Sequence, residues 1–255
     1  FDMKKLIFIT GASSGIGYEV SKEFSRQGWN VISSARRINL LNNLANKCKP
    51  YRGDVFPLKL DITDTAILKK KIYLAIKKYG IPDIIFLNAG TNNPNSKKIL
   101  SVEETKKIFN INFFSVIECI SIFLPIIKKK KNCQIIIMSS VAGYRGLPYA
   151  SAYCSSKSAL TSFTESIFNQ CKQIGVNLRL VNPGFVKTPL TDKNNFPMPM
   201  IITAKKASKI LYKKFIFSKK FEINLPIIFC LIMKLLRILP YSIYFKITNK
   251  LLKSL

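Results

Sequence analysis

The chain has 255 residues, with 41 Lys and Arg, 13 Asp and Glu, no His and six Cys. This length suits one α/β domain with a large core, and the lack of histidine excludes Ser-His-Asp hydrolysis and His-ligated metals, so we expect no metal site. The net charge of +28 comes with no helix-turn-helix, zinc-finger or RNA-binding signature, so nucleic acid is not an expected partner. The cysteines form no C-x-x-C pair, so they are expected as reduced thiols, mostly in the core.

Strands and helices are predicted to alternate along the chain. Pro57 places the third strand, 55–60, near a sheet edge, and Pro125 should kink or shorten the long fourth helix, 102–130. The alternation predicts an α/β fold with a doubly wound, Rossmann-type parallel sheet and helices on both faces. The expected strands are 5–10, 30–35, 55–60, 83–87, 134–138, 177–181 and 222–225, and the expected helices are 15–28, 40–47, 64–79, 102–130, 152–174 and 204–217.

The N-terminal strand is too short for a secretory signal, because only Leu6 to Ile9 separate Lys4 and Lys5 from a polar glycine loop. The sequence therefore predicts a cytoplasmic protein. Near the other end, residues 183–203 are rich in Pro and Asn and are predicted as a long loop that binds substrate.

A glycine loop follows the first strand and opens the first helix. Its glycines, at 11, 15 and 17, let the backbone approach a pyrophosphate, and the helix directs its N–H groups and positive dipole end at the anion. The loop therefore predicts a dinucleotide site formed by Gly11, Ser13, Ser14, Gly15, Ile16 and Gly17.

A Tyr-x-x-x-Lys pair occurs three times, beginning at Tyr18, Tyr73 and Tyr153. Only the third has a serine at the end of a preceding strand. There Ser140 precedes Tyr153 by thirteen residues, and Ser139 is the adjacent alternative. The i, i+4 spacing on a helix places Lys157 beside Tyr153.

Together, the glycine loop and this serine-tyrosine-lysine set resemble the short-chain dehydrogenase/reductase family over about residues 4–225. Asn88-Ala89-Gly90 matches the family's motif after the fourth strand, Asn112 its helix asparagine, and Pro183-Gly184 its motif after the sixth strand. The loop after Pro183 and the later Leu-Leu-Arg-Ile-Leu-Pro stretch resemble a largely uncharacterised bacterial branch. The resemblance implies about seven strands, a homodimer or homotetramer, and NAD(P)-dependent oxidation of an alcohol or reduction of a ketone or aldehyde.

The resemblance also implies roles for individual residues. Tyr153 would be the proton donor, with a pKa lowered toward neutrality by the Lys157 ammonium and the oxidised nicotinamide. Ser140 would donate a second hydrogen bond to the substrate oxygen. Asn112 would hold a water that links Lys157 to solvent, with Asn110 as the alternative residue.

Further contacts to the cofactor are implied by the same resemblance. Asp61 and Ile62 would contact the adenine, although Asp61 also suits a helix cap or a turn. Thr188, or the backbone of Val186, would contact the nicotinamide carboxamide, although Thr188 also suits an ordinary loop position.

Cofactor choice is read at the end of the second strand, where Arg36 and Arg37 follow Ala35. An arginine fork suits the 2′-phosphate of NADP(H), whereas an acidic residue there would suit NAD(H). We expect an NADP(H)-dependent reductase in which Arg36 binds the 2′-phosphate. The alternatives are an NAD-dependent alcohol dehydrogenase and a noncatalytic nucleotide-binding scaffold associated with a membrane.

The C-terminal tail divides the chain into a catalytic domain, 3–225, and a basic amphipathic segment, 226–255. If the tail is helical from Pro226, its polar or small residues share one face and its aliphatic residues cover the others. Three roles stay open for it: binding an anionic membrane surface, forming a subunit interface, or covering the substrate cleft. The tail and the apolar loop residues favour an apolar or lipid-like substrate; those loop residues are Phe185, Phe196, Met198 and Met200.

Overall fold

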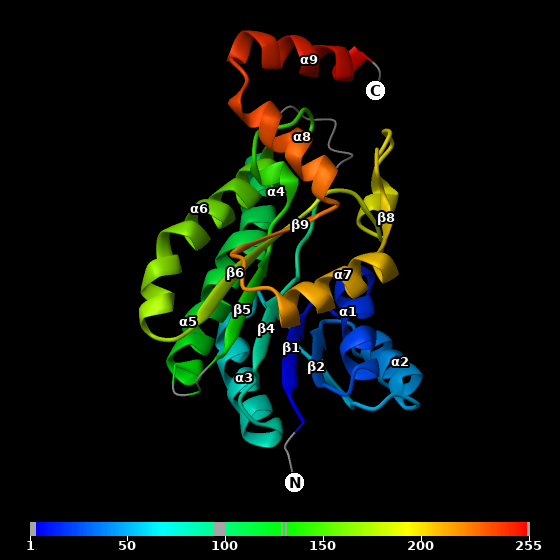
Figure 1. Cartoon of the computed structure of the whole chain (residues 1–255), viewed down its shortest axis with the longest axis vertical. Coiled ribbons are helices and arrows are strands. Elements are labelled where there is room, and N and C mark those ends of the chain that lie inside the picture. The colour runs from blue at the N-terminus through cyan, green and yellow to red at the C-terminus, as the bar shows by residue number, and fades with distance from the viewer. Residues whose placement is uncertain (1–3, 94–99, 129, 131, 254–255) are drawn as a thin grey trace.

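The computed structural model describes residues 4–93, 100–128, 130 and 132–253, with the side chains of 251–253 left out. Seven strands form one parallel sheet in the order β3-β2-β1-β4-β5-β6-β9 (Figure 1), so the predicted doubly wound sheet is confirmed. β3 lies at an edge, as Pro57 predicted. The strands are β1 (Leu6–Thr10), β2 (Asn30–Ala35), β3 (Val55–Lys59), β4 (Ile84–Leu87), β5 (Gln134–Met138), β6 (Asn177–Pro183) and β9 (Glu222–Leu225).

Helices cover both faces of the sheet, and a separate apolar core fills each side. One core lies between the sheet and α1, α2 and α7, and the other lies between the sheet and α3, α5 and α6 (Figure 1). All six cysteines are buried free thiols. The bounds of these helices are α1 (Gly15–Arg26), α2 (Ile38–Cys48), α3 (Thr65–Tyr79), α5 (Ser115–Ile127), α6 (Ser151–Gln173) and α7 (Ala204–Phe217).

The long fourth helix differs from its prediction in two ways. A π-helical turn, Asn110–Phe114, joins α4 (Val102–Phe109) to α5, and α5 ends at Ile127, two residues after Pro125, rather than at residue 130. Among the described residues, the run Val102–Ile127 is long and apolar enough to cross a membrane by length and composition. Its inner face, however, packs into the core beneath the sheet, as in the central helix of a soluble protein.

Residues 183–203 hold more regular structure than the predicted loop. β6 extends to Pro183, and β7 (Val186–Lys187) pairs with β8 (Ile202–Thr203) in a small second sheet. Phe185 of this segment does not line the cleft described below: its ring packs on Phe196 and on Phe229 of the tail. These paired strands fix the segment between the main sheet and the tail.

The tail folds into two helices, α8 (Ile227–Ile238) and α9 (Tyr241–Lys253), at the end of the molecule opposite the N-terminus (Figure 1). The predicted helical tail is therefore present. The prediction assigned Cys230, Lys234, Arg237 and Tyr241 to one polar or small face, and the structure divides it: Cys230 is fully buried and Lys234 pairs with Glu222 of β9, while Arg237 and Tyr241 are exposed. The physical reason is that β9 offers Lys234 a carboxylate partner.

Candidate active site

A cleft of about 310 Å³ opens at the carboxyl ends of the strands, between β1 and β4, where the strand order of the sheet reverses. Open α/β sheets bind ligands at this switch point. Gly17 and Asn112 of the predicted set do not line the cleft. The structure brings all the other predicted residues together around it: Gly11, Ser13, Ser14, Gly15, Ile16, Arg36, Asp61, Ile62, Asn88, Ala89, Gly90, Ser140, Tyr153, Lys157, Pro183, Gly184, Val186 and Thr188.

The glycine loop presses directly against the end of β4. Gly11 has a φ of +70°, and a Cβ there would lie 2.8 Å from the Cα of Ala89. The Asn88 side-chain amide donates to the carbonyl oxygens of Thr10 and Gly11, at 3.0 and 3.3 Å. A Cβ at Gly17 would lie 2.6 Å from the Gly11 oxygen, so this glycine, although outside the cleft, lets α1 approach the loop.

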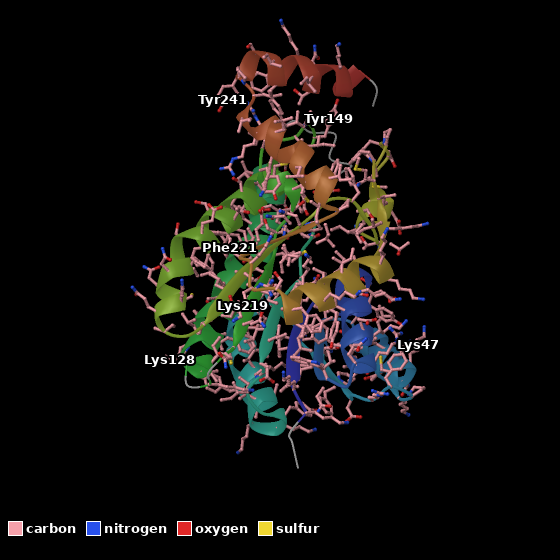
Figure 2. The ribbon with its side chains drawn as sticks, viewed as in Figure 1. Lys47, Lys128, Tyr149, Lys219, Phe221 and Tyr241 are labelled. Atoms are coloured by element: carbon pink, nitrogen blue, oxygen red, sulfur yellow. The ribbon has the colours of Figure 1, made fainter. Side chains whose placement is uncertain are left out.

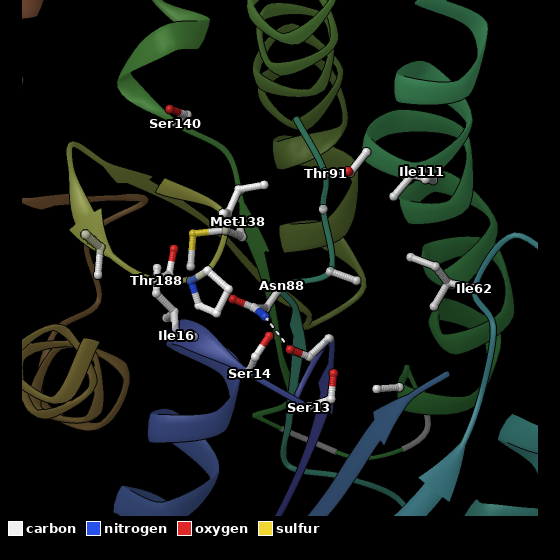
Figure 3. Close-up of a pocket in the computed structure, with 18 of the residues that line it drawn as sticks. Ser13, Ser14, Ile16, Ile62, Asn88, Thr91, Ile111, Met138, Ser140 and Thr188 are labelled. Atoms are coloured by element: carbon white, nitrogen blue, oxygen red, sulfur yellow. Dashed lines mark hydrogen bonds between the residues drawn. The ribbon is translucent and has the colours of Figure 1, made fainter. Parts of the chain in front are cut away.

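The first turn of α1 is suited to an anion. Ser14 is the N-cap residue, yet its side chain forms no capping hydrogen bond. Its hydroxyl and that of Ser13 instead accept hydrogen bonds from the Arg37 guanidinium, at 3.1 and 2.9 Å. The helix N–H groups are therefore available to a pyrophosphate, and Figure 3 shows Ser13, Ser14 and Ile16 beside Asn88 and Thr188 around this space. The residues fit a dinucleotide.

Two arginines and one carboxylate surround the far end of the cleft. Arg36 and Arg37 both line it, and among the described residues Asp61 is the single acidic side chain that does so. Asp61 accepts hydrogen bonds from the backbone and hydroxyl of Thr63, at 3.0 and 2.7 Å. Burial opposes its charge, but these bonds and the Arg36 charge together lower the pKa of Asp61. Arg37 was not among the predicted site residues, although its position beside Arg36 was a usable signal.

Ser140, Tyr153 and Lys157 meet at the opposite end. Of the three Tyr-x-x-x-Lys pairs, only Tyr153 and Lys157 line the cleft. Ser139 is occupied elsewhere, because its hydroxyl bonds with the Lys157 backbone oxygen and the Thr161 hydroxyl, at 3.2 and 2.9 Å. Ser140 is therefore the serine available to a ligand.

The pKa values at this end of the cleft move in opposite directions. Burial raises the pKa of Tyr153 to about 12, although a hydrogen bond with Ser140 opposes the shift. Burial lowers the pKa of Lys157 to about 8. The Lys157 amino group donates to the Met138 backbone oxygen at 2.8 Å and lies 5.9 Å from the centre of the Tyr153 ring.

The sequence argument expected the Lys157 ammonium to help lower the Tyr153 pKa, whereas here the Ser140 hydrogen bond is the group that opposes the effect of burial. The Lys157 amino group is directed at the Met138 oxygen. The positive charge of an oxidised nicotinamide would lower the Tyr153 pKa further.

Asn112 lies behind the cleft, fully buried in the π-helical turn. Its side chain bonds with both backbone groups of Thr91, at 2.8 and 2.9 Å, and with the Ser156 hydroxyl at 3.1 Å. A Cβ at Gly90 would lie 3.3 Å from the Asn112 oxygen and 3.6 Å from the Lys157 nitrogen. Asn112 and Lys157 thus flank one small space beside Gly90. The alternative, Asn110, is exposed.

Thr188 and the segment around it close the cleft over the glycine loop. The Thr188 backbone N–H donates to the Thr191 hydroxyl at 2.9 Å, and Thr191 donates in turn to the Val186 oxygen at 2.8 Å. A Cβ at Gly15 would meet the Thr188 methyl group at 3.2 Å. Thr191 also lines the cleft and was not predicted, because no motif in the sequence identifies it.

A second cavity of about 460 Å³ adjoins the first, and Tyr153 lines both. The second cavity lies between α4, the segment 146–152 and α9 of the tail. Tyr244, Phe245 and Thr248 of α9 form one wall. The loop residues Phe185, Phe196, Met198 and Met200, which suggested an apolar substrate, line neither cavity. The apolar wall is made instead by Ile108, Leu147, Pro148, Tyr149, Tyr244 and Phe245.

Arg145 holds α9 at this cavity. Its guanidinium donates to three backbone oxygens at the end of α8, those of Leu236, Arg237 and Leu239, at 2.6–3.0 Å. It also lies 3.9 Å from the centre of the Tyr244 ring, whose hydroxyl donates to the Gly146 oxygen. One arginine therefore connects the catalytic end of the sheet to both tail helices.

Comparison with known proteins gives a consistent result. The family described as short chain dehydrogenase matches residues 5–198. An uncharacterized oxidoreductase of Myxococcus xanthus is 30% identical over 236 residues, covering 92% of this chain and 93% of that protein. A short chain dehydrogenase/reductase of Burkholderia phymatum in complex with NAD has a TM-score of 0.82 at 20% identity, covering 92% and 94% of the two chains. A short-chain dehydrogenase of Sphingobium yanoikuyae in complex with NADPH has a TM-score of 0.78 at 19% identity, covering 88% of each.

Proposed function

Because this chain belongs to the short-chain dehydrogenase family and is an NAD(P)-dependent oxidoreductase acting on CH–OH or C=O groups, we propose that it is an NADPH-dependent reductase of an apolar ketone or aldehyde. The reverse reaction, oxidation of the alcohol, uses the same groups. The observation that carries this proposal is the position of Tyr153, which lines both the cofactor cleft and the second cavity. A carbonyl group held in the second cavity can reach Tyr153 and the cofactor cleft together.

The chemistry requires a hydride, a proton and support for the charge that develops on oxygen. When bound, NADPH supplies the hydride to the carbonyl carbon. Tyr153, whose pKa of about 12 keeps it protonated at neutral pH, donates the proton to the oxygen. Ser140 donates a second hydrogen bond to the same oxygen. Lys157 stabilises the phenolate left on Tyr153, and Asn112, fixed by Thr91, positions the neighbouring backbone.

An apolar substrate is supported by the composition of the second cavity. Four of its residues, Ile108, Leu147, Pro148 and Phe245, carry no side-chain polar group, and Tyr149 and Tyr244 add aromatic surface. Apolar and aromatic walls with a few polar groups are typical of small-molecule sites. Besides the tyrosine hydroxyls, the polar groups come from Asn92, Asn93, Ser101, Glu104, Thr105, Ser151 and Thr248. We therefore propose a lipid-like chain bearing the reactive carbonyl.

NADPH is favoured over NADH because Arg36 and Arg37 lie where the 2′-phosphate would bind, while the Asp61 carboxylate is bonded to Thr63. The test is a titration of the protein with NADPH and with NADH, followed by nicotinamide fluorescence. Arg36→Ala should weaken NADPH binding by roughly 10–100-fold, since a hydrogen bond to a charged group contributes about 1.5–3 kcal/mol. It should leave NADH binding almost unchanged.

Lys47→Ala is the matched control, because Lys47 is an exposed cation of α2 outside the cleft (Figure 2). Tight NADPH and weak NADH binding would support the proposal. The opposite preference would favour an NAD-dependent alcohol dehydrogenase, and binding of neither would favour a nucleotide-binding scaffold without catalysis.

We also propose that the enzyme works in the cytoplasm as a homodimer or homotetramer. Members of this family are commonly oligomers, and Val102 and Phe114 leave apolar surface exposed along the α4–α5 run. Light scattering on the purified protein tests the oligomeric state, and a monomer at micromolar concentration would contradict the proposed oligomer.

A further inference from the structure

The helix α8 buries Phe229, Cys230 and Met233 against the protein, and Lys234 also faces it. Lys234 pairs with Glu222, whose carboxylate also accepts a hydrogen bond from the Tyr144 hydroxyl at 2.6 Å. The buried Cys230 thiol donates to the Asn182 oxygen at 3.3 Å. Phe229 packs over Gly184, where a Cβ would lie only 2.5 Å from its ring. These contacts fix the rotation of α8 about its own axis.

The consequence is an exposed aliphatic face, which we call the outward face of α8. Its members recur three or four residues apart, so they form one continuous stripe. None of them lines the cofactor cleft or the second cavity. They are Ile227, Ile228, Leu231, Ile232, Leu235 and Ile238, with exposed fractions of 44–75%. Soluble monomers rarely expose a contiguous apolar patch of this kind without a binding role.

The charged residues of the tail itself are all cations. Between residues 223 and 255 the chain has no Asp or Glu, while it has Lys234, Arg237, Lys246, Lys250 and Lys253. The whole chain has a net charge of +28. Lys246 and Lys250 are exposed on α9. Lys234 is paired with Glu222, but an apolar stripe beside the remaining cations is complementary to lipid headgroups of negative charge.

We propose that the outward face of α8 docks the protein onto an anionic lipid bilayer, with α8 lying in the plane of the interface. A helix of 12 residues is about 18 Å long, well short of the roughly 30 Å of a hydrocarbon core, so α8 does not span the bilayer. A second copy of the chain fits this face less well. Two such surfaces facing each other would bring the exposed Arg237 of each copy together, and the tail itself has no carboxylate to offset their charge.

Docking in this way would place α9 and the second cavity beside the lipid, because α9 follows α8 directly and forms one wall of that cavity (Figure 1). This last consequence rests on the proposed function, since it concerns delivery of an apolar substrate. Docking itself does not depend on catalysis, so the two can fail separately.

The experiment is co-flotation of the full chain with vesicles of phosphatidylcholine alone or of an equal mixture of phosphatidylcholine and phosphatidylglycerol, at physiological salt. The test variant is Leu231→Asn with Leu235→Asn, which changes no charge. The matched control is Leu74→Asn, since Leu74 is 55% exposed on α3, at the other end of the molecule. Thermal unfolding of each variant confirms folding without reference to activity.

We expect the wild-type protein and Leu74→Asn to float with the anionic vesicles and the double variant to lose at least tenfold in binding. Binding of the wild type to pure phosphatidylcholine should be much weaker, and high salt should release the protein. Three results would overturn the proposal. They are wild-type protein that stays unbound, a double variant that binds as well as the wild type, and a wild-type oligomer that the double variant converts to monomers without any vesicle binding.

Discussion

The cofactor cleft and the C-terminal tail are held together by different kinds of contact. Backbone packed on backbone holds the cleft: a Cβ at Gly11 would lie 2.8 Å from Ala89, and Asn88 bonds with two carbonyl groups of the loop. Side chains hold the tail: Phe229, Cys230 and Met233 of α8 form an apolar cluster with residues of the catalytic domain, and Arg145 and the pair of Lys234 with Glu222 add polar contacts. The difference suggests that the cleft is one rigid unit, while the tail is an attachment that single substitutions can loosen.

The largest expected effect lies within the cleft, at Tyr153. Tyr153→Phe removes the hydroxyl that we propose as the proton donor and leaves the ring that separates the two cavities. Turnover should fall by about 10²–10⁴-fold, the usual contribution of general acid catalysis. NADPH binding should persist, because the phosphate end of the cleft is built by the glycine loop and the arginines. Steady-state kinetics and fluorescence titration on one preparation measure both quantities.

Tyr18→Phe is the control for this substitution, because it alters another Tyr-x-x-x-Lys pair that does not line the cleft. Its kinetics should match the wild type. If Tyr153→Phe kept wild-type turnover, the tyrosine would not be the acid. If Tyr153→Phe lost NADPH binding as well, the phosphate end of the cleft would depend on the catalytic end, contrary to what the backbone contacts suggest.

The sequence predicted the parts of the cleft that depend on local motifs. The glycine loop, Asn88-Ala89-Gly90 and the pair Tyr153 and Lys157 each sit at a strand end or on a helix, so order along the chain determines their place. Thr191 was missed because its contact with Val186 appears only once the loop is folded, whereas Arg37 was missed although it stands beside Arg36. The π-helical turn around Asn112 was missed as well, because residues 102–130 were predicted as one continuous helix.

The second expected effect is a dependence of the reduction rate on pH. Burial lowers the pKa of Lys157 to about 8, so its ammonium is present below pH 8 and is lost as pH rises through this value. Tyr153 stays protonated until about pH 12 and cannot cause a change there. The reduction rate should therefore fall by roughly tenfold for each pH unit above about 8. A pH profile of kcat measures this fall.

Lys157→Arg tests whether Lys157 is the group whose titration causes the fall in rate above about pH 8. Arginine keeps its charge across the whole range, so any residual activity of this variant should show no fall near pH 8. A limb at the same pH in Lys157→Arg would mean that another group titrates. A flat wild-type profile would mean that the bound cofactor moves the pKa of Lys157 out of the range.

The tail shows where sequence patterns stop being informative. Its amphipathic character was evident from the spacing of the aliphatic residues, yet that spacing does not say which face meets the protein. Glu222, Tyr144 and Asn182 decide this by binding Lys234 and Cys230, and they come from β9, from the segment after β5 and from β6. The orientation of α8 therefore depends on contacts between residues up to 90 positions apart, such as Tyr144 and Lys234.

The smallest effect tests whether the tail can be loosened without harm to the cleft. Arg145→Ala removes three hydrogen bonds to α8 and the stacking on Tyr244, so α9 should hold the wall of the second cavity less firmly. The KM for a long apolar ketone should rise by roughly tenfold, equivalent to about 1.4 kcal/mol of binding. The KM for NADPH and the turnover of a short ketone should stay near wild type.

Arg52→Ala is the control, because Arg52 is an exposed arginine outside both cavities. If NADPH binding and short-ketone turnover fell together with long-ketone binding, the tail and the cleft would form a single cooperative unit, and the contrast between them would be wrong.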